Sequence, residues 1–246
     1  MDNLKVSIIT PNLNSGKYLE QTINSVLNQT YKNIEYIVVD GGSTDESEKI
    51  LKKYQNKISK LIIEKDENMY QAIDKGIRIA NGEIISWINS DDLYFPKAIE
   101  NAVKAFQNLN CDWIVGKVSK KFGEKTITYP FPFYYPKNKI INRKCNKMEY
   151  GCIPQESVLF KKSLYIKSGG LDLNKKFSSD FLLWVKFSKH TELITINKKI
   201  GIFRVLKNQL SSNQTNYYNE LDMTYKYTFN FYRIIYSLIR FLFFKN

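Results

Sequence analysis

The sequence is poor in cysteine and histidine, which limits the kinds of site it can build. Its 246 residues include three cysteines, Cys111, Cys145 and Cys152, and a single histidine, His190. Three scattered thiols are too few for a disulfide framework, and with one imidazole they make no credible zinc site. His190 stands in the polar stretch SKHT and is predicted to lie on the surface. The sequence therefore shows no Ser–His or Cys–His pair for nucleophilic catalysis.

Neither a signal peptide nor a long apolar run is predicted from the sequence. Its N-terminal sequence, MDNLKVSIIT, has an acidic residue at position 2 and only a short apolar segment, so it is not a signal peptide. The most apolar stretch, residues 229–244, contains Arg233 and Arg240 and is shorter than the roughly 20 residues that span a bilayer. We therefore expect a protein of the reducing cytoplasm.

Positive charge, in contrast, is abundant. The formal net charge is +13, from 37 Lys and Arg against 24 Asp and Glu. A basic protein prefers polyanions such as nucleic acid, anionic lipid or phosphorylated small molecules, but a lysine-rich composition with solvated charges is an equally good interpretation. The lysines are spread along the whole chain, whereas the aromatic residues are concentrated in the irregular loop and in the tail. A nucleic-acid-binding module should instead combine clustered basic residues with aromatic ones, so this distribution disfavours it.

Apolar strands alternate with amphipathic helices in the first half of the chain. Continuous apolar runs predict buried strands, and apolar residues at helical spacing predict helices. The predicted strands are residues 6–10, 34–40, 61–64, 84–88 and 113–118, and the predicted helices are residues 18–27, 44–54, 69–80 and 96–106. This alternation predicts an α/β fold with a parallel sheet covered on both faces.

The second half is less regular. Residues 129–151 mix proline, aromatic residues and lysine without a period, which predicts a long functional loop. A strand at 157–161, a helix at 180–187 and strands at 193–196 and 200–205 are predicted to follow. The end of the chain, FNFYRIIYSLIRFLFFKN, predicts a helix that lies in a membrane interface, or one that packs on the core or on a partner subunit.

Three predicted strands end in polar residues at the edge where parallel sheets gather functional groups. The residues at these three ends include Pro11, Asn12 and Asn14, then Asp40, then Asp91 and Asp92. Adjacent carboxylates repel each other and raise each other's pKa, unless a cation or several donors stabilise them. A hard divalent cation such as Mg²⁺ or Mn²⁺ would do so and could also bind a diphosphate. A cap for the helix that follows is the alternative interpretation of the pair.

The order of these motifs closely resembles glycosyltransferase family 2. VSIITPNLN, YIVVDGGSTDES and DENMYQAIDKGIRIANGEIISWINSDDLYFPKA carry the resemblance, which continues more loosely through IPQESVLFKKSLYIKSGGLD and FSSDFLLWVKF. It implies a GT-A fold with a Rossmann-like, mostly parallel central sheet flanked by helices. It also implies a domain over residues 1–212, with a donor half at about 1–118 and an acceptor half at about 119–212, followed by a helical tail at 213–246.

The resemblance implies roles for the residues at the strand ends. Pro11, Asn12 and Asn14 would lie against the nucleotide, and Asp40 would accept a hydrogen bond from the base. Asp91 would sit at the ribose and sugar. Asp92 would hold the Mg²⁺ or Mn²⁺ beneath the diphosphate, with Asp91 as a second ligand.

Four further assignments come from the same resemblance. Asp180 would be the general base, although Ser179 stands where the family has Glu; an acid stabilised at a helix N-terminus is a compatible interpretation. Asp74, in the place of a family Asn, would lie near the donor. Arg204 would face the diphosphate or lie on the surface, and Gln155 and Glu156 would line the acceptor side.

The expected function is that of an inverting, metal-dependent transferase. It would move a sugar from a nucleotide-diphosphate sugar, with UDP expected, to a hydroxyl of a glycan or lipid-linked saccharide in bacterial surface polysaccharide synthesis. The tail would bring the protein to anionic lipid at the inner face of the plasma membrane. A sugar-nucleotide nucleotidyltransferase is one alternative, but it should carry a glycine-rich phosphate loop that TPNLNSGKYL lacks. A basic nucleic-acid-binding module and an inactive scaffold are the others.

Overall fold

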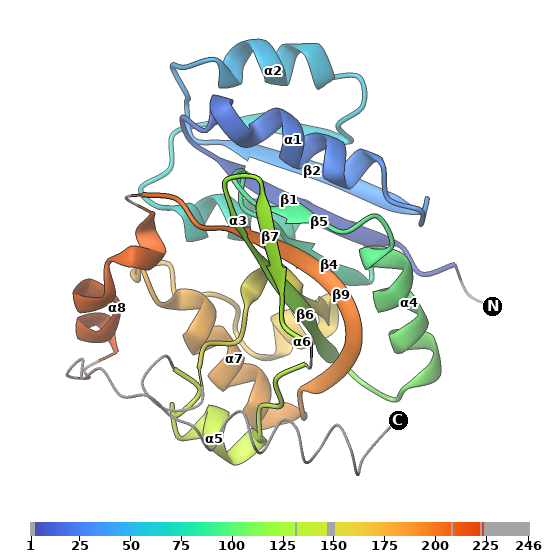
Figure 1. Cartoon of the computed structure of the whole chain (residues 1–246), viewed down its shortest axis with the longest axis vertical. Helices are drawn as coiled ribbons and strands as arrows, with labels where there is room; N and C mark the ends of the chain where they lie inside the picture. The colour runs from blue at the N-terminus through green and yellow to red at the C-terminus, as the bar shows by residue number, and fades with distance from the viewer. Residues whose placement is uncertain (1–2, 131, 147–150, 208, 222, 224–246) are drawn as a thin grey trace.

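The computed structural model describes residues 3–130, 132–146, 151–207, 209–221 and 223. Within these residues a nine-stranded sheet runs in the order β3-β2-β1-β4-β8-β6-β9-β5, and β7 pairs with β6 (Figure 1). The strands are β1 (Val6–Asn12), β2 (Ile34–Asp40), β3 (Lys60–Ile63), β4 (Ile84–Trp87), β5 (Leu93–Tyr94), β6 (Trp113–Phe122), β7 (Lys125–Thr128), β8 (Val158–Lys161) and β9 (Ile194–Arg204).

The sheet is mixed, and its parallel part is built from the first half of the chain. β3, β2, β1 and β4 are parallel neighbours. β8 is antiparallel to both β4 and β6, whereas β9 is parallel to β6. The predicted α/β fold is confirmed, and the parallel arrangement predicted for the sheet holds from β1 to β4. The carboxyl ends of β1, β2 and β4 therefore meet at one edge, as expected.

Helices cover both faces of the sheet. Because successive strand residues point to opposite faces, Ile8 and Ile9 of β1 belong to two separate cores. The core around Ile8 is closed by α1 (Gly16–Leu27), α2 (Ser47–Tyr54) and α4 (Ala98–Asn108). The core around Ile9 is closed by α3 (Met69–Ile79), α5 (Lys137–Ile141), α6 (Lys162–Lys167) and α7 (Ser179–His190).

Three tryptophans fix α7 against the sheet. Trp184 of α7 stacks on Trp87 of β4 at 5.4 Å and on Trp113 of β6 at 5.7 Å, measured between ring centroids. All three side chains are fully buried. Large stacked aromatic rings contribute both apolar area and geometric preference. The N-terminus of α7, which carries Asp180, is thereby held at a defined place beside the sheet.

Several predictions about the second half need correction. The predicted loop at 129–151 contains α5, and the two strands predicted at 193–196 and 200–205 are one strand, β9. After η2 (Leu210–Ser212), the segment assigned to the tail begins with α8 (Gln214–Glu220), whereas residues 222 and 224–246 lie outside the described residues.

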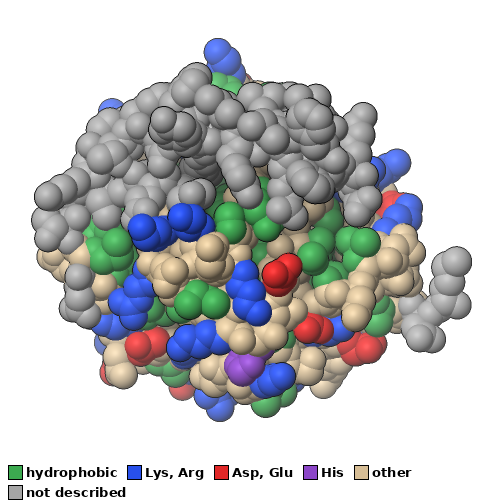
Figure 2. Space-filling model, turned by 90° about the horizontal axis from the view of Figure 1, so that it is seen from below, with side chains coloured by type: hydrophobic (Ala, Val, Ile, Leu, Met, Phe, Trp, Pro, Cys, Tyr) green, Lys and Arg blue, Asp and Glu red, His purple; other side chains and the backbone are tan. Residues whose placement is uncertain are grey.

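Among the residues described, no helix has the length and apolar character needed to cross a bilayer. His190 is exposed as predicted and lies among charged side chains (Figure 2).

Candidate active site

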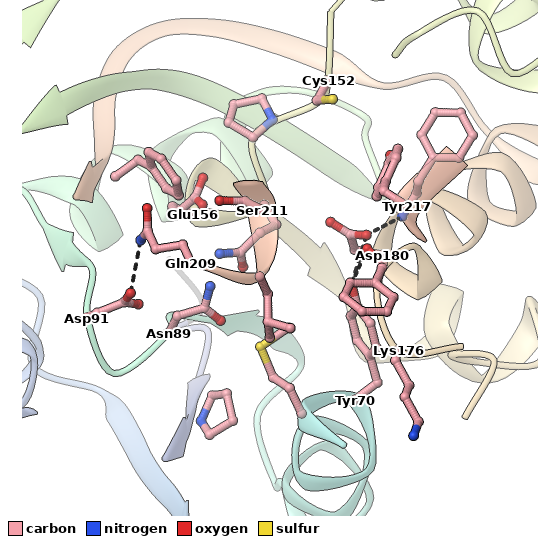
Figure 3. A pocket seen from close by; sticks show the side chains of 18 of the residues that line it. Tyr70, Asn89, Asp91, Cys152, Glu156, Lys176, Asp180, Gln209, Ser211 and Tyr217 are labelled. Carbon is pink, nitrogen blue, oxygen red and sulfur yellow. Dashed lines mark hydrogen bonds between the residues drawn. The ribbon is translucent and has the colours of Figure 1, made fainter. Parts of the chain in front are cut away.

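A cavity of about 810 Å³ opens beside the carboxyl ends of β1 and β4 (Figure 3). One side is formed by the loops after β1, β2, β3 and β4, and the other by β6, the start of α7 and the segment after β9. Several of its polar side chains lie on elements far apart in the sequence, and these are Asn12, Asn89, Asp91, Glu156, Asp180 and Gln209. This volume is typical of a small-molecule site.

Of the residues predicted at the nucleotide, Pro11 and Asn12 line the cavity, whereas Asn14 and Asp40 do not. Asp40 is buried, and its carboxylate accepts hydrogen bonds from the Asn12 Nδ2 at 2.6 Å, the Ser43 Oγ at 2.6 Å and the Ser43 N at 2.8 Å. Asn14 accepts from the Thr44 N at 2.8 Å. Asp40 and Asn14 therefore shape the loops that present Asn12, and a direct contact of either with a nucleotide has no support in this geometry.

The adjacent carboxylates Asp91 and Asp92 have different environments. Asp91 lines the cavity, and its Oδ2 accepts from the Gln209 Nε2 at 3.0 Å. Asp92 is fully buried and its Oδ1 accepts from the Arg204 N at 2.9 Å. Burial, with Glu156 and Asp91 nearby, holds the pKa of Asp92 well above its usual range. Of the two predicted metal ligands, Asp91 lines the cavity and Asp92 does not, which corrects the place predicted for Asp92.

Arg204 lies beneath the Asp91 loop, on neither the cavity wall nor the surface. Its guanidinium donates from Nη1 to the Asp91 carbonyl at 2.6 Å and from Nη2 to the Gln21 Oε1. The Arg204 Cζ lies 5.1 Å from the centroid of the Tyr18 ring. Burial lowers the pKa of Arg204, and the nearby Asp92 opposes that change. Arg204 thus fixes the position of Asp91, which corrects the prediction that it faces the diphosphate.

Asp74 has a structural role as well. It is buried on α3, where its Oδ1 accepts from the Tyr165 hydroxyl at 2.7 Å and its Oδ2 from the Arg78 Nε at 2.6 Å. Tyr165 belongs to α6, so its bond to Asp74 joins two helices that cover the same face, whereas the Arg78 bond lies within α3. Asp74 does not line the cavity, which corrects its predicted place near the donor.

Asp180 lies in the first turn of α7 and lines the cavity. Its Oδ1 accepts from the Tyr70 hydroxyl at 3.0 Å and from the Phe181 N at 2.8 Å (Figure 3). Burial raises the pKa of Asp180, and these two hydrogen bonds oppose the rise. A raised pKa makes this carboxylate a better proton acceptor, whereas its place at a helix N-terminus favours the charged form.

Glu156 is a second titratable group in the same cavity. It is buried in η1 (Gln155–Ser157), and burial raises its pKa to about 7. Gln155 and Glu156, for which the family resemblance implied a place on the acceptor side, both line the cavity.

Sequence reasoning missed Tyr70 and Gln209. Tyr70 has one local signal, the Asn68 cap of α3, whose Oδ1 accepts from the Tyr70 N at 2.9 Å.

The oxygen atoms near Asp91 fit a cation that takes few protein ligands. The Asn89 Oδ1 is buried without a hydrogen-bond partner, and both Asn89 and Asp91 line the cavity. No three His, Cys, Asp or Glu side chains gather as a metal-binding group within the described part of the chain. Mg²⁺ commonly uses one or two carboxylates and completes its sphere with phosphate oxygens and water. The site therefore suits a cation that arrives with a phosphorylated ligand.

The family model for glycosyl transferase family 2 matches residues 7–166. The chain belongs to glycosyltransferase family 2. An uncharacterised glycosyltransferase of Rickettsia typhi is 30% identical over 88% of this chain and 69% of its own length. The poly(ribitol-phosphate) beta-N-acetylglucosaminyltransferase TarP of Staphylococcus aureus is 28% identical over 95% of this chain and 72% of its own length. This family 2 enzyme is thus a glycosyltransferase, as the motifs predicted.

Two solved structures share its fold. S. aureus TarS 1–349 in complex with UDP-GlcNAc has a TM-score of 0.67 at 18% identity, over 88% of this chain and 64% of that one. The mannosyltransferase PcManGT from Pyrobaculum calidifontis, in complex with GDP-Man and Mn²⁺, has a TM-score of 0.66 at 17% identity, over 92% of this chain and 66% of that one. The predicted GT-A fold of this glycosyltransferase is therefore confirmed.

Proposed function

We propose that this family 2 enzyme is an inverting glycosyltransferase that moves a sugar from a UDP-sugar to a hydroxyl of a glycan or lipid-linked saccharide. The observation that carries the proposal is that Asp91 and Asp180 line one cavity from two different elements. The names of TarP, an N-acetylglucosaminyltransferase, and of TarS with bound UDP-GlcNAc support an N-acetylhexosamine donor carried by UDP.

The donor would lie across the ends of β1 and β4. Pro11, Asn12 and Gly41 would contact the nucleoside, and Asn12 is held for that purpose by Asp40. Asp91, with the oxygen of Asn89, would hold a divalent cation at the diphosphate. When bound, Mg²⁺ or Mn²⁺ would stabilise the negative charge that develops on the leaving diphosphate. The complex of PcManGT with Mn²⁺ supports the metal dependence.

The acceptor would enter from the side of α7. A sugar hydroxyl is a poor nucleophile at neutral pH, and Asp180 would take its proton as the hydroxyl attacks the anomeric carbon. The Tyr70 hydroxyl holds the carboxylate in place at 3.0 Å. Attack from the face opposite to the leaving nucleoside diphosphate inverts the configuration, and no covalent enzyme intermediate is needed.

Two further parts of the proposal concern the cell. We propose a role in bacterial surface polysaccharide synthesis, which the poly(ribitol-phosphate) acceptor in the name of TarP supports. We also propose that the enzyme works in the cytoplasm at the inner face of the plasma membrane, with the tail at the lipid surface. The donor half at about 1–118 and the acceptor half at about 119–212 remain a proposal as well.

Two variants test the assignment of the two acids. Asp180→Asn should lower turnover by about 10²- to 10⁴-fold, because it removes the base and leaves the donor contacts intact. Asp91→Asn should lower turnover and also abolish the Mn²⁺-dependent part of the heat of UDP binding in calorimetry. Transfer would be measured with a panel of nucleotide sugars.

Asp112→Asn is the matched control, since Asp112 is half-exposed and pairs with Lys161 outside the cavity. Its turnover and nucleotide binding should equal those of the wild type. Full activity of Asp180→Asn would refute the general base, and Mn²⁺-dependent UDP binding by Asp91→Asn would refute the cation ligand.

A further inference from the structure

The carboxylate of Glu220 contacts the loop that precedes Asp180. It lies at the end of α8, and it accepts from three consecutive amides, the Lys176 N at 2.7 Å, the Phe177 N at 2.9 Å and the Ser178 N at 3.0 Å. It also accepts from the Ser178 Oγ at 2.9 Å. The Lys175 Nζ donates to the backbone carbonyl of Glu220 at 2.9 Å. Five hydrogen bonds therefore join one residue to a loop about forty positions earlier.

This carboxylate lies just before the N-terminus of α7. Ser178 is the N-cap residue of α7, but its side chain makes no capping hydrogen bond within the helix. Glu220 brings a negative charge close to that helix end, where the helix dipole favours an anion, although the amides it binds precede the first turn. Burial acts to raise the pKa of Glu220, but the amide and hydroxyl donors outweigh it and lower the pKa. Glu220 is therefore charged at neutral pH.

The loop held by Glu220 is linked directly to Asp180. The Tyr70 hydroxyl, which donates to the Asp180 Oδ1, also lies 3.3 Å from the Phe177 carbonyl. A shift of Phe177 would therefore move the hydroxyl that orients the carboxylate. Asp180 follows the three amides bound by Glu220 by two to four positions, so the direction of its side chain depends on the same loop.

The helix that carries Glu220, α8, also forms part of the cavity wall. Tyr217 of α8 lines the cavity and meets the ring of Phe181 edge-on at 6.4 Å. Tyr218 and Leu221 are buried in the described structure. The segment 213–221 thus belongs to the folded catalytic unit, although the sequence assigned it to the tail.

We propose that Glu220 is a positioning residue of this glycosyltransferase, which holds the loop before α7 so that Asp180 faces the acceptor hydroxyl. This inference rests on the proposed function, because it assumes that Asp180 acts as the base. It also predicts that α8, beyond the part matched by the family model, is required for transfer.

Glu220→Gln tests the proposal, since glutamine has nearly the same shape and loses the charge and one acceptor. Turnover should fall by about 10- to 100-fold, because small displacements of a reacting group are costly. UDP binding in calorimetry should stay within about twofold, since the donor side is untouched. Glu220→Asp, which keeps the charge, should recover part of the turnover. The control Glu192→Gln removes an exposed carboxylate just beyond the other end of α7 and should match the wild type.

The pH profile separates positioning from a merely structural effect. The charge of Glu220 contributes to the raised pKa of Asp180, so Glu220→Gln should move the acid limb of the turnover profile to lower pH. The other groups that face Asp180 are Glu156 before β8, Tyr70 of α3 and Tyr217 of α8, and they are unchanged in the variant. Lys176 extends away from Asp180 (Figure 3).

Two measurements keep this inference independent of the proposed function. Amide hydrogen exchange at residues 176–178 should become faster in Glu220→Gln, and an NMR titration of the Asp180 carboxyl should show its lowered pKa. Unchanged exchange and an unchanged Asp180 pKa would overturn the inference even if the wild type transfers sugar. Faster exchange with wild-type turnover would overturn it too. Absence of transfer by the wild type, together with the shifted Asp180 pKa, would overturn the proposed function and leave the physical link intact.

Discussion

At the scale of single residues, the environment of a carboxylate decides its role more than its type does. Asp91 lines the cavity, whereas Asp92, the next residue, is fully buried against the Arg204 amide. Asp40 uses its oxygens to hold Asn12 and the following turn. Of these three acids, Asp91 alone reaches the cavity, which makes it the carboxylate available to a ligand.

Glu156 gives a prediction about stability and pH. Its pKa of about 7 in the folded protein lies above the ordinary value of 4.5, because burial penalises the charged form. Between these two values the folded state binds more protons than the unfolded state, so the contribution of Glu156 to stability falls as pH rises. Glu156→Gln should therefore be more stable than the wild type at pH 8, by roughly 1–3 kcal/mol, with little difference near pH 4.

Urea unfolding of the two proteins at both pH values measures this difference. Glu124→Gln is the control, because the Glu124 side chain is fully exposed. A stability difference between Glu156→Gln and the wild type that is the same at both pH values would contradict the proposed cause.

At the scale of secondary structure, prediction from the sequence worked best for elements in which consecutive residues are buried. β2 was predicted with its observed bounds, Ile34–Asp40, because six of its seven residues are buried and apolar side chains dominate them. β5 has two residues and α5 has five, which is too short for a periodic pattern. β9 was predicted as two strands because the exposed Lys198 and Lys199 interrupt its apolar pattern, although its pairing with β6 continues on both sides of them.

The candidate site could be predicted only in part for a related reason. The motifs located Asn12, Asp91 and Asp180, all of which line the cavity. Side-chain direction depends on partners far away in the sequence, which no local pattern reports. Asp74 is bonded to Tyr165, and Ser178 is bonded to Glu220. Such pairs become visible only when the helices are placed in space.

Gly201 gives a prediction at this scale, because β9 passes unusually close to η1. A Cβ added to Gly201 would lie 2.3 Å from the Glu156 carbonyl oxygen, a backbone atom that cannot turn away. Gly201→Ala should therefore separate β9 from η1 and lower the free energy of unfolding by about 1–3 kcal/mol. Thermal and urea unfolding would measure the loss.

Gly41→Ala is the matched control, since a Cβ there would stay 3.5 Å from the Leu13 side chain, an ordinary contact. Its free energy of unfolding should be within about 0.5 kcal/mol of the wild type. A Gly201→Ala protein as stable as this control would show that β9 and η1 can separate freely.

At the scale of the whole molecule, the positive charge is distributed among acidic side chains. On the part of the face described in Figure 2, lysine and arginine side chains are interspersed with aspartate and glutamate. A net charge of +13 that is spread in this way would attract anionic surfaces at long range. Attraction of this kind is screened by salt over about 10 Å at 0.1 M, so a stable membrane location needs a second, apolar contribution.

The final part of the sequence would supply such a contribution under the proposed function, and its removal tests the predicted membrane location. Residues 224–246 combine bulky aromatic residues with Arg233 and Arg240. A chain that ends at Met223 keeps α8 and its bonds to the loop before α7, and circular dichroism would verify that it folds. In vesicle sedimentation, the full chain should bind vesicles that contain anionic lipid and the shortened chain should not. Replacing both arginines by glutamine should weaken binding by roughly 30-fold, since each basic residue contributes about 1 kcal/mol at an anionic surface. Zwitterionic vesicles are the control, and equal binding of the full and shortened chains to anionic vesicles would refute a membrane role for residues 224–246.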